Sequence, residues 1–221
     1  MPVKSDREYR NFEVRALEPQ EQEATETEAE QRKVVRGYAS TFENEYTLWD
    51  DGETVIREVI DSHAFDDTDM TDVIMQYDHE GRVFARGSNG TLRVAPDEEG
   101  VAIEADLGGT ELGRQIYDEV KGGYTNKMSV GMKIDRSRDI WTSSNLNGKV
   151  VEVRRVMRVA KLYDVSAVSL PANDATSISV RSLVDGVIER LTAERQEAQK
   201  LELERRRAEV RARALAGGKK E

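Results

Sequence analysis

Short stretches of alternating apolar and polar residues run through most of the first 181 residues, and this alternation is typical of strands with one buried face. The clearest stretch is 101–107, where Val101, Ile103, Ala105 and Leu107 alternate with Ala102, Glu104 and Asp106. Similar patterns predict strands at 9–17, 34–42, 53–60, 73–77, 83–94, 128–134, 149–160 and 162–170. Gly87-Ser88-Asn89-Gly90 and Asn145-Leu146-Asn147-Gly148 predict turns within this series. The chain is therefore expected to be mainly β.

An acidic segment separates the first two predicted strands. Residues 18–31 are rich in Glu, Gln and Thr, which predicts a solvated loop or a frayed helix. We expect strands 9–17 and 34–42 to pair as a hairpin around this acidic loop.

Helical spacing occurs in two places. Residues 110–121 place Leu112, Ile116, Tyr117 and Val120 on one face, and Gly122-Gly123 is a plausible end for that helix. Beyond Ser182 a weaker apolar stripe runs through a segment dominated by Glu, Arg, Lys, Gln and Ala. We therefore predict an α+β domain over 1–181 and a charged helical tail over 182–221.

Charge and composition narrow the classes of partner. The 221 residues carry a formal net charge of −10, with −12 in residues 1–181 and +2 in the tail. An acidic chain has no general affinity for nucleic-acid phosphates or anionic membranes. The N-terminus is polar and lacks the apolar stretch of a signal peptide, and no run approaches the ~20 apolar residues of a membrane helix. We expect a soluble protein that acts where it is made, with no specific nucleic acid and no membrane partner.

The two histidines, His63 and His79, restrict the search for catalytic groups. His79 follows the apolar stretch 73–77 and precedes Gly81, so a rigid strand would hold it at the mouth of a loop. That position suits a general base. A polar histidine in a turn between acids is the alternative interpretation.

Ser129 is the candidate nucleophile, because it lies among apolar residues with Gly131 two places on. The segment is not the Gly-x-Ser-x-Gly elbow, since Lys127 occupies the first Gly position. Both histidines also precede Ser129, which is the wrong order for an α/β-hydrolase. A small residue on a packed strand remains the alternative.

Asp164 lies in the middle of an apolar strand, where a buried carboxylate is costly unless it has a partner. Orienting an imidazole would give it one, although an exposed face of an edge strand would also accommodate it. The acid-dense segment 66–72 lacks the Gly and the terminal Glu of an EF-hand loop. There is no cysteine, so a zinc site would depend on carboxylates. We predict neither a metal nor another cofactor.

Taken together, five segments resemble the prohead protease family of tailed bacteriophages. They occur in the family's order, over roughly residues 9 to 181. The segments are Val35–Phe42 (an opening Gly-Tyr-Ala strand), Asp61–Phe65 (an Ala-Phe turn), Asp78-His79, Met128–Met132 (a Ser-x-Gly segment) and Asp164–Asn173 (an acid-Val-Ser strand ending in Pro-Ala-Asn).

The resemblance implies a fold similar to herpesvirus assemblin, with a β-barrel core and flanking helices. It also implies a serine endopeptidase in which Ser129 is the nucleophile, His79 the general base and Asp164 the third member. His63, which replaces a small residue in the Ala-Phe turn, is the competitor for that third role. Arg154-Arg155 loosely resemble a basic pair near the assemblin oxyanion site, but no oxyanion donor is assigned.

The implied function is cleavage of the scaffolding segment of the major capsid protein, of any separate scaffold and of the protease itself. It would take place inside the phage prohead, in the host cell cytoplasm, without a cofactor, and it allows for a homo-oligomer. The tail would be a scaffold-like segment removed by self-cleavage. The alternatives are a non-catalytic capsid scaffolding or assembly protein, a protease fused to its own scaffold, and a metal-dependent hydrolase.

Overall fold

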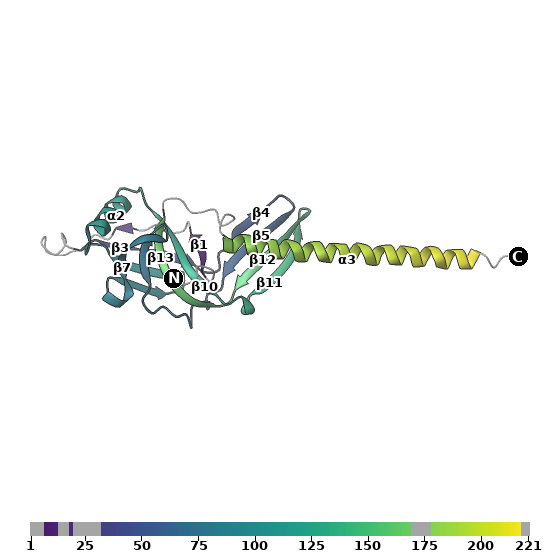
Figure 1. Cartoon of the computed structure of the whole chain (residues 1–221), viewed down its shortest axis with the longest axis horizontal. Coiled ribbons are helices and arrows are strands. Elements are labelled where there is room, and N and C mark those ends of the chain that lie inside the picture. The colour runs from purple at the N-terminus through teal and green to yellow at the C-terminus, as the bar shows by residue number, and fades with distance from the viewer. Residues whose placement is uncertain (1–6, 13–17, 20–31, 169–177, 218–221) are drawn as a thin grey trace. The chain divides into compact units, whose positions relative to one another are not determined.

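A computed structural model describes residues 7–12, 18–19, 32–168 and 178–217 (Figure 1). The chain divides into two compact units, Met1–Val180 and Arg181–Glu221. Each unit is described by itself.

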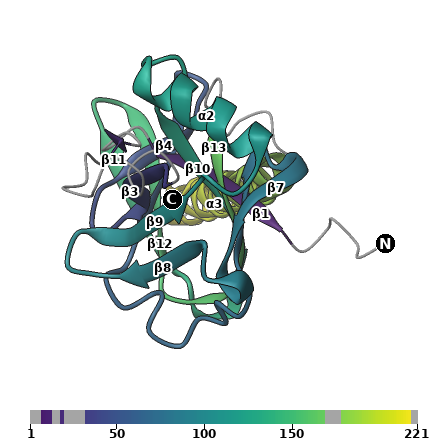
Figure 2. The ribbon, with the colours of Figure 1, turned by 90° about the vertical axis from the view of Figure 1, so that its left-hand side faces the viewer.

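The described strands of the first unit form three sheets (Figures 1 and 2). The five-stranded sheet has the order β1 (Glu8–Phe12), β10 (Lys127–Ile134), β13 (Val159–Val168), β6 (Ile74–Tyr77) and β7 (Glu80–Arg86). One four-stranded sheet has the order β11 (Ile140–Leu146), β12 (Lys149–Val156), β5 (Thr54–Ile60) and β4 (Tyr46–Asp50). The other has the order β2 (Glu18–Pro19), β3 (Val34–Thr41), β9 (Gly100–Asp106) and β8 (Leu92–Pro96).

The apolar faces of the strands meet in one core. On β9, Val101, Ile103 and Ala105 are buried as their alternation predicts. Met75 of β6 and Val130 of β10 lie in the same cluster and have no exposed surface. Burying such a side chain contributes roughly 1.5–3 kcal/mol, so this core fixes which face of each strand turns inward. The opposite face of the five-stranded sheet is left for polar residues.

The predicted helix of the first unit is α2 (Glu111–Lys121). Thr110 caps its start, since the hydroxyl accepts a hydrogen bond from the Gly113 backbone N–H. Ile116, Tyr117 and Val120 form its buried face. The helix ends at Lys121 and is capped by Gly122, where the sequence predicted its end.

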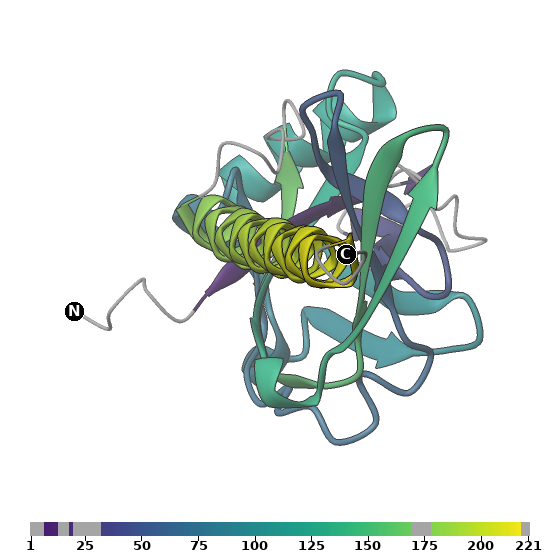
Figure 3. The same cartoon turned by 90° about the vertical axis from the view of Figure 1, so that its right-hand side faces the viewer.

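Four expectations need revision or addition. The mainly β class is confirmed, but the three sheets of the described residues do not include a closed barrel. The expected hairpin of 9–17 with 34–42 is wrong for the described part of the first strand, because β1 pairs with β10. Of the expected acidic loop, residues 18–19 form β2 and pair with β3, while 20–31 lie outside the described residues. Strands β4 and β11 were not predicted; β11 forms a hairpin with β12, drawn in green in Figure 3.

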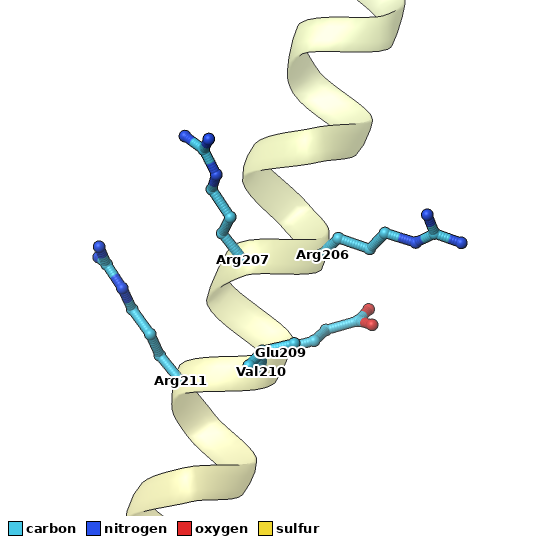
Figure 4. Close-up of a pocket in the computed structure, with 5 residues that line it drawn as sticks. All are labelled: Arg206, Arg207, Glu209, Val210 and Arg211. Atoms are coloured by element: carbon cyan, nitrogen blue, oxygen red, sulfur yellow. The ribbon is translucent and has the colours of Figure 1, made fainter.

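The described residues of the second unit belong to helix α3, which spans Ile178–Gly217. Where side chains are described beyond Thr192, they are exposed. Figure 4 shows five of them, Arg206, Arg207, Glu209, Val210 and Arg211, projecting from one stretch of the helix. These residues line a depression of about 590 Å³, but a single helix cannot enclose a ligand. No helix among the described residues is both long and apolar enough to cross a membrane.

Candidate active site

The five-stranded sheet brings together the three residues singled out in the sequence. Ser129 lies on β10 and Asp164 on the adjacent strand β13. His79 lies in the turn between β6 and β7, and β6 is the next strand of the sheet after β13. Three segments that are distant in sequence therefore supply a hydroxyl, a carboxylate and an imidazole to one side of one sheet.

A two-residue turn presents the imidazole. Tyr77 pairs with Glu80, so Asp78 and His79 alone connect β6 to β7. Both have positive φ, 47° for Asp78 and 59° for His79, which is the geometry of a tight type I′ hairpin. Such backbone strain in non-Gly residues costs about 1–3 kcal/mol each. The Asp78 backbone N–H donates to the Ala167 carbonyl of β13 over 2.9 Å, which ties the turn to the strand of Asp164.

The three side chains form a continuous hydrogen-bonded series. His79 Nε2 lies 2.6 Å from Ser129 Oγ, and His79 Nδ1 lies 2.5 Å from Asp164 Oδ1. With Nδ1–H donating to the carboxylate, Nε2 is unprotonated and accepts from the serine hydroxyl. This is the arrangement in which an imidazole removes the proton from a nucleophilic serine.

The Asp164 carboxylate is buried, with 1% of its side chain exposed. Its Oδ1 accepts a second hydrogen bond, from Ser166 Oγ over 3.0 Å. It fits there because the cross-strand neighbour is Gly131, where a Cβ atom would lie only 2.0 Å from Asp164 Oδ2. The Ser129-x-Gly131 spacing thus places the hydroxyl and an empty space for the carboxylate on the same face of β10.

Ser129 has no exposed surface, whereas 15% of the His79 side chain is exposed. Ser129 Oγ lies 3.0 Å from the Arg10 carbonyl oxygen as well as 2.6 Å from His79 Nε2. A hydroxyl has one hydrogen, so it donates either to Nε2 or to the Arg10 carbonyl. When the imidazole is doubly protonated, the donor to Ser129 is Nε2–H and the hydroxyl donates to Arg10.

The remaining candidates lie elsewhere. His63 contacts Asp66 over 3.1 Å, and 79% of its side chain is exposed, so it does not take the third position. Arg154 donates to Glu58 and Asp139, and Arg155 to Glu43 and Asp61, so carboxylates engage both guanidinium groups.

The acid-dense segment 66–72 does not gather its carboxylates for a cation. Asp69 pairs with Lys161 and Asp72 with Arg86, over 2.6 and 2.7 Å. Among the described residues no group of three or more His, Cys, Asp or Glu side chains is placed to hold a metal ion.

Sequence reasoning missed Ser166 and the Arg10 carbonyl, and it noted Gly131 beside Ser129 without the space that it leaves for the Asp164 carboxylate. Ser166 and Gly131 each lie two positions from a nominated residue on the same strand face, so period-2 alternation was a usable signal for both. No local signal linked Arg10 to Ser129, because 119 residues separate them.

A comparison with known protein families finds a match. The family model of the caudovirus prohead serine proteases matches residues 19–187, a range that contains His79, Ser129 and Asp164. The chain belongs to the caudovirus prohead serine protease family. No curated protein and no solved structure matches the chain. Membership of this family makes the chain a serine peptidase of tailed phages by family. The matched range begins after β1, at residues 8–12, so that strand lies outside it.

Proposed function

We propose that this chain is the maturation endopeptidase of its phage and cleaves the scaffolding segment of the major capsid protein, any separate scaffold and itself inside the prohead. The observation that carries the proposal is the series Ser129–His79–Asp164, with heavy-atom distances of 2.6 and 2.5 Å. The family match supplies the phage context.

The geometry suggests the order of proton movements. Ser129 Oγ attacks the scissile carbonyl carbon while His79 Nε2 takes the hydroxyl proton. The imidazolium is stabilised by the Asp164 carboxylate, and Nε2 then gives the proton to the leaving amine. Water repeats the sequence on the acyl-serine and frees the enzyme. No step calls for a cofactor.

Substrate access has to come from the His79 side. Because Ser129 Oγ has no exposed surface, a scissile carbonyl reaches it only after a local shift of the covering segments. His79 lies at the tip of a two-residue turn and is partly exposed, so that turn is the accessible edge of the site.

The proposal is tested by co-expressing the chain with its cognate capsid protein in the bacterial cytoplasm. We expect Ser129→Ala and His79→Ala to leave the capsid protein uncleaved, and Asp164→Asn to lower the cleavage rate by roughly 10⁴-fold through the wrong imidazole tautomer. Gel electrophoresis and mass spectrometry of the capsid protein report the result.

A serine and a histidine away from the candidate site provide matched controls. Ser143→Ala on exposed β11 and His63→Ala in its exposed turn should cleave like the wild type. Normal trimming by Ser129→Ala would remove the nucleophile assignment. An inert wild type that still promotes shell assembly would favour the alternative, a non-catalytic scaffolding or assembly protein.

The tail is part of the proposal. Residues 182–221 carry ten Lys or Arg and eight Asp or Glu, and the described side chains of α3 beyond Thr192 are exposed. We assign this helix a scaffold-like role, ended by self-cleavage near its start. A solvated helix serving solubility alone is the competing interpretation.

A further inference from the structure

The N-terminal strand β1 borders the nucleophile strand, although it lies outside the family match. Its register with β10 pairs Tyr9 with Gly131 and Asn11 with Ser129. Because side chains alternate along an extended chain, Tyr9 of β1 and Arg7, which directly precedes the strand, share the face that meets the candidate site. Residues Glu8 and Arg10 occupy the other face.

This segment contacts each member of the triad. The Tyr9 ring lies 4.3 Å from the His79 ring between centroids, tilted by 53°. Arg7 Nη1 lies 3.8 Å from Asp164 Oδ2, and the Arg10 carbonyl oxygen lies 3.0 Å from Ser129 Oγ.

Arg7 lies near Asp164 Oδ2, the carboxylate oxygen that does not contact His79. Oδ1 accepts from both His79 and Ser166, whereas Oδ2 is buried and has no hydrogen-bond partner among the described residues. A buried carboxylate oxygen without a partner is costly, and the nearby guanidinium offsets part of that cost. The guanidinium is held in turn by the Tyr163 ring, 4.2 Å from its centroid.

The ring of Tyr9 packs against the imidazole ring of His79. The imidazole belongs to a two-residue turn with positive φ, and among the described residues its two nitrogens contact only Ser129 and Asp164. A ring packed against its face limits rotation about the side-chain bonds. Burial, followed by the negative charge of Asp164, raises the pKa of the Tyr9 phenol, so Tyr9 stays neutral at physiological pH.

The opposite face of β1 holds the strand in place. Arg10 donates to Glu58 of β5 from Nε over 2.5 Å and from Nη2 over 3.0 Å, and it also donates to Glu8. Arg154 of β12 donates to the same Glu58 over 2.8 Å. These four side chains are buried and connect β1 to the sheet of β5 and β12. We call them the buried ion cluster.

We infer that Arg7 and Tyr9 are positioning residues of the active site, with Arg7 fixing the Asp164 carboxylate and Tyr9 fixing the His79 imidazole. The inference rests on the proposed function for its kinetic consequences. Neither side chain reacts. Each restricts the movement of His79 or Asp164 and so holds Nε2 where it can take the serine proton. Misplacement of a reacting group by about 1 Å costs on the order of 10²-fold in rate.

The test uses the full chain with Arg7→Gln, which removes the charge at similar length, and Tyr9→Leu, which removes the ring. We expect each to lower kcat for capsid-protein cleavage by tenfold to a hundredfold with KM within twofold of wild type. The rate of Ser129 labelling by a fluorophosphonate should fall in parallel. Arg7→Lys should recover part of the loss, and Tyr9→Phe nearly all of it.

Two further measurements separate positioning from a general structural role. The low-field proton resonance of the His79 Nδ1–H should broaden or vanish in Arg7→Gln and Tyr9→Leu. It should persist in the matched controls Arg36→Ala and Tyr38→Leu, because the polar groups of these β3 residues contact Glu104 of β9 and Asp97, which follows β8. Thermal unfolding sets a common assay temperature below every melting transition.

The outcomes distinguish this inference from the proposed function. A folded wild type that neither labels at Ser129 nor cleaves capsid protein would overturn the proposed function. A wild type that labels, with Arg7→Gln and Tyr9→Leu labelling at the same rate and retaining the low-field resonance, would overturn the positioning role alone. Loss of rate without recovery by Arg7→Lys and Tyr9→Phe would also contradict it.

Discussion

At the scale of single residues, the candidate site depends on the missing side chain of Gly131 as much as on Ser129, His79 and Asp164. Gly131 leaves the space into which the Asp164 carboxylate projects. It pairs with Asp164 of β13 on one side and with Tyr9 of β1 on the other. The family resemblance nominated Ser129, His79 and Asp164, and the structure places them within hydrogen-bonding distance. Residues that act on them through packing had no motif of their own, so sequence reasoning passed over them.

We expect Gly131→Ala to disable the enzyme with limited damage to the fold. The added methyl would lie 2.0 Å from Asp164 Oδ2, so the carboxylate must leave His79 or the strands must separate. Cleavage should fall by about 100-fold or more. The free energy of unfolding should fall by about 1–3 kcal/mol, as for other overpacked sites. Capsid-protein cleavage and thermal unfolding measure both quantities.

Gly87→Ala is the control for that substitution. The Cβ atom added there would meet its nearest neighbours at 3.5 Å, an ordinary contact, and we expect activity near wild type. If Gly131→Ala cleaved as fast as Gly87→Ala, the described place of the Asp164 carboxylate would be wrong.

At the scale of elements, alternation predicted strands well and their partners poorly. Strands β9 and β10 have clear apolar faces, because each buries one side in the core. Strand β11 escaped prediction because its residues 142–146 are all exposed and mostly polar, which leaves no alternation to detect. The pairing of β1 with β10 connects residues more than a hundred positions apart, and hydrophobic patterning does not encode a partner at that range.

The buried ion cluster makes the attachment of β1 depend on pH. Burial alone raises the pKa of Glu58, but Arg10 and Arg154 outweigh it and lower the pKa to about 2, from an ordinary value of 4.5. A group with a depressed folded-state pKa stabilises the fold above its unfolded pKa and loses that contribution as pH falls through the folded pKa. We therefore expect stability to decline between about pH 4.5 and 2, as denaturant unfolding over that range would show.

Glu58→Gln tests the same cluster at neutral pH. Leaving Arg10 and Arg154 buried without their carboxylate should lower the free energy of unfolding by about 3–5 kcal/mol. The exposed pair of Arg36 and Glu104 provides the control, because Glu104→Gln should change stability by about 1 kcal/mol or less. Equal effects of the two substitutions would show that the cluster does not hold the sheets together.

At the scale of the whole molecule, the chain joins a β-rich unit to a 40-residue helix, and the two have different compositions. A mixed α and β chain with a charged helical end was predictable from periodicity. The division of the described strands into three sheets without a closed barrel was not, because long-range packing decides which strands are neighbours.

Self-removal of the tail is testable by intact-mass analysis of the purified full chain. If α3 is a temporary segment, the wild type should shorten with time to a product ending near residue 181, whereas Ser129→Ala should keep its full mass. Shortening of both proteins at equal rates would indicate a contaminating protease. A wild type that stays intact while it processes capsid protein would contradict self-removal.

The contacts around Ser129 join residues far apart in the sequence, so the site can assemble only late in translation. The hydroxyl depends on Arg10, 119 residues earlier, and His79 depends on Asp164, 85 residues later. A ribosome must therefore deliver nearly the whole β-rich unit, from β1 through β13, before a nascent copy can bring Ser129, His79 and Asp164 together. Under the proposed function, each newly made molecule is therefore inactive until its translation is nearly complete, and it cannot cleave capsid subunits during that interval.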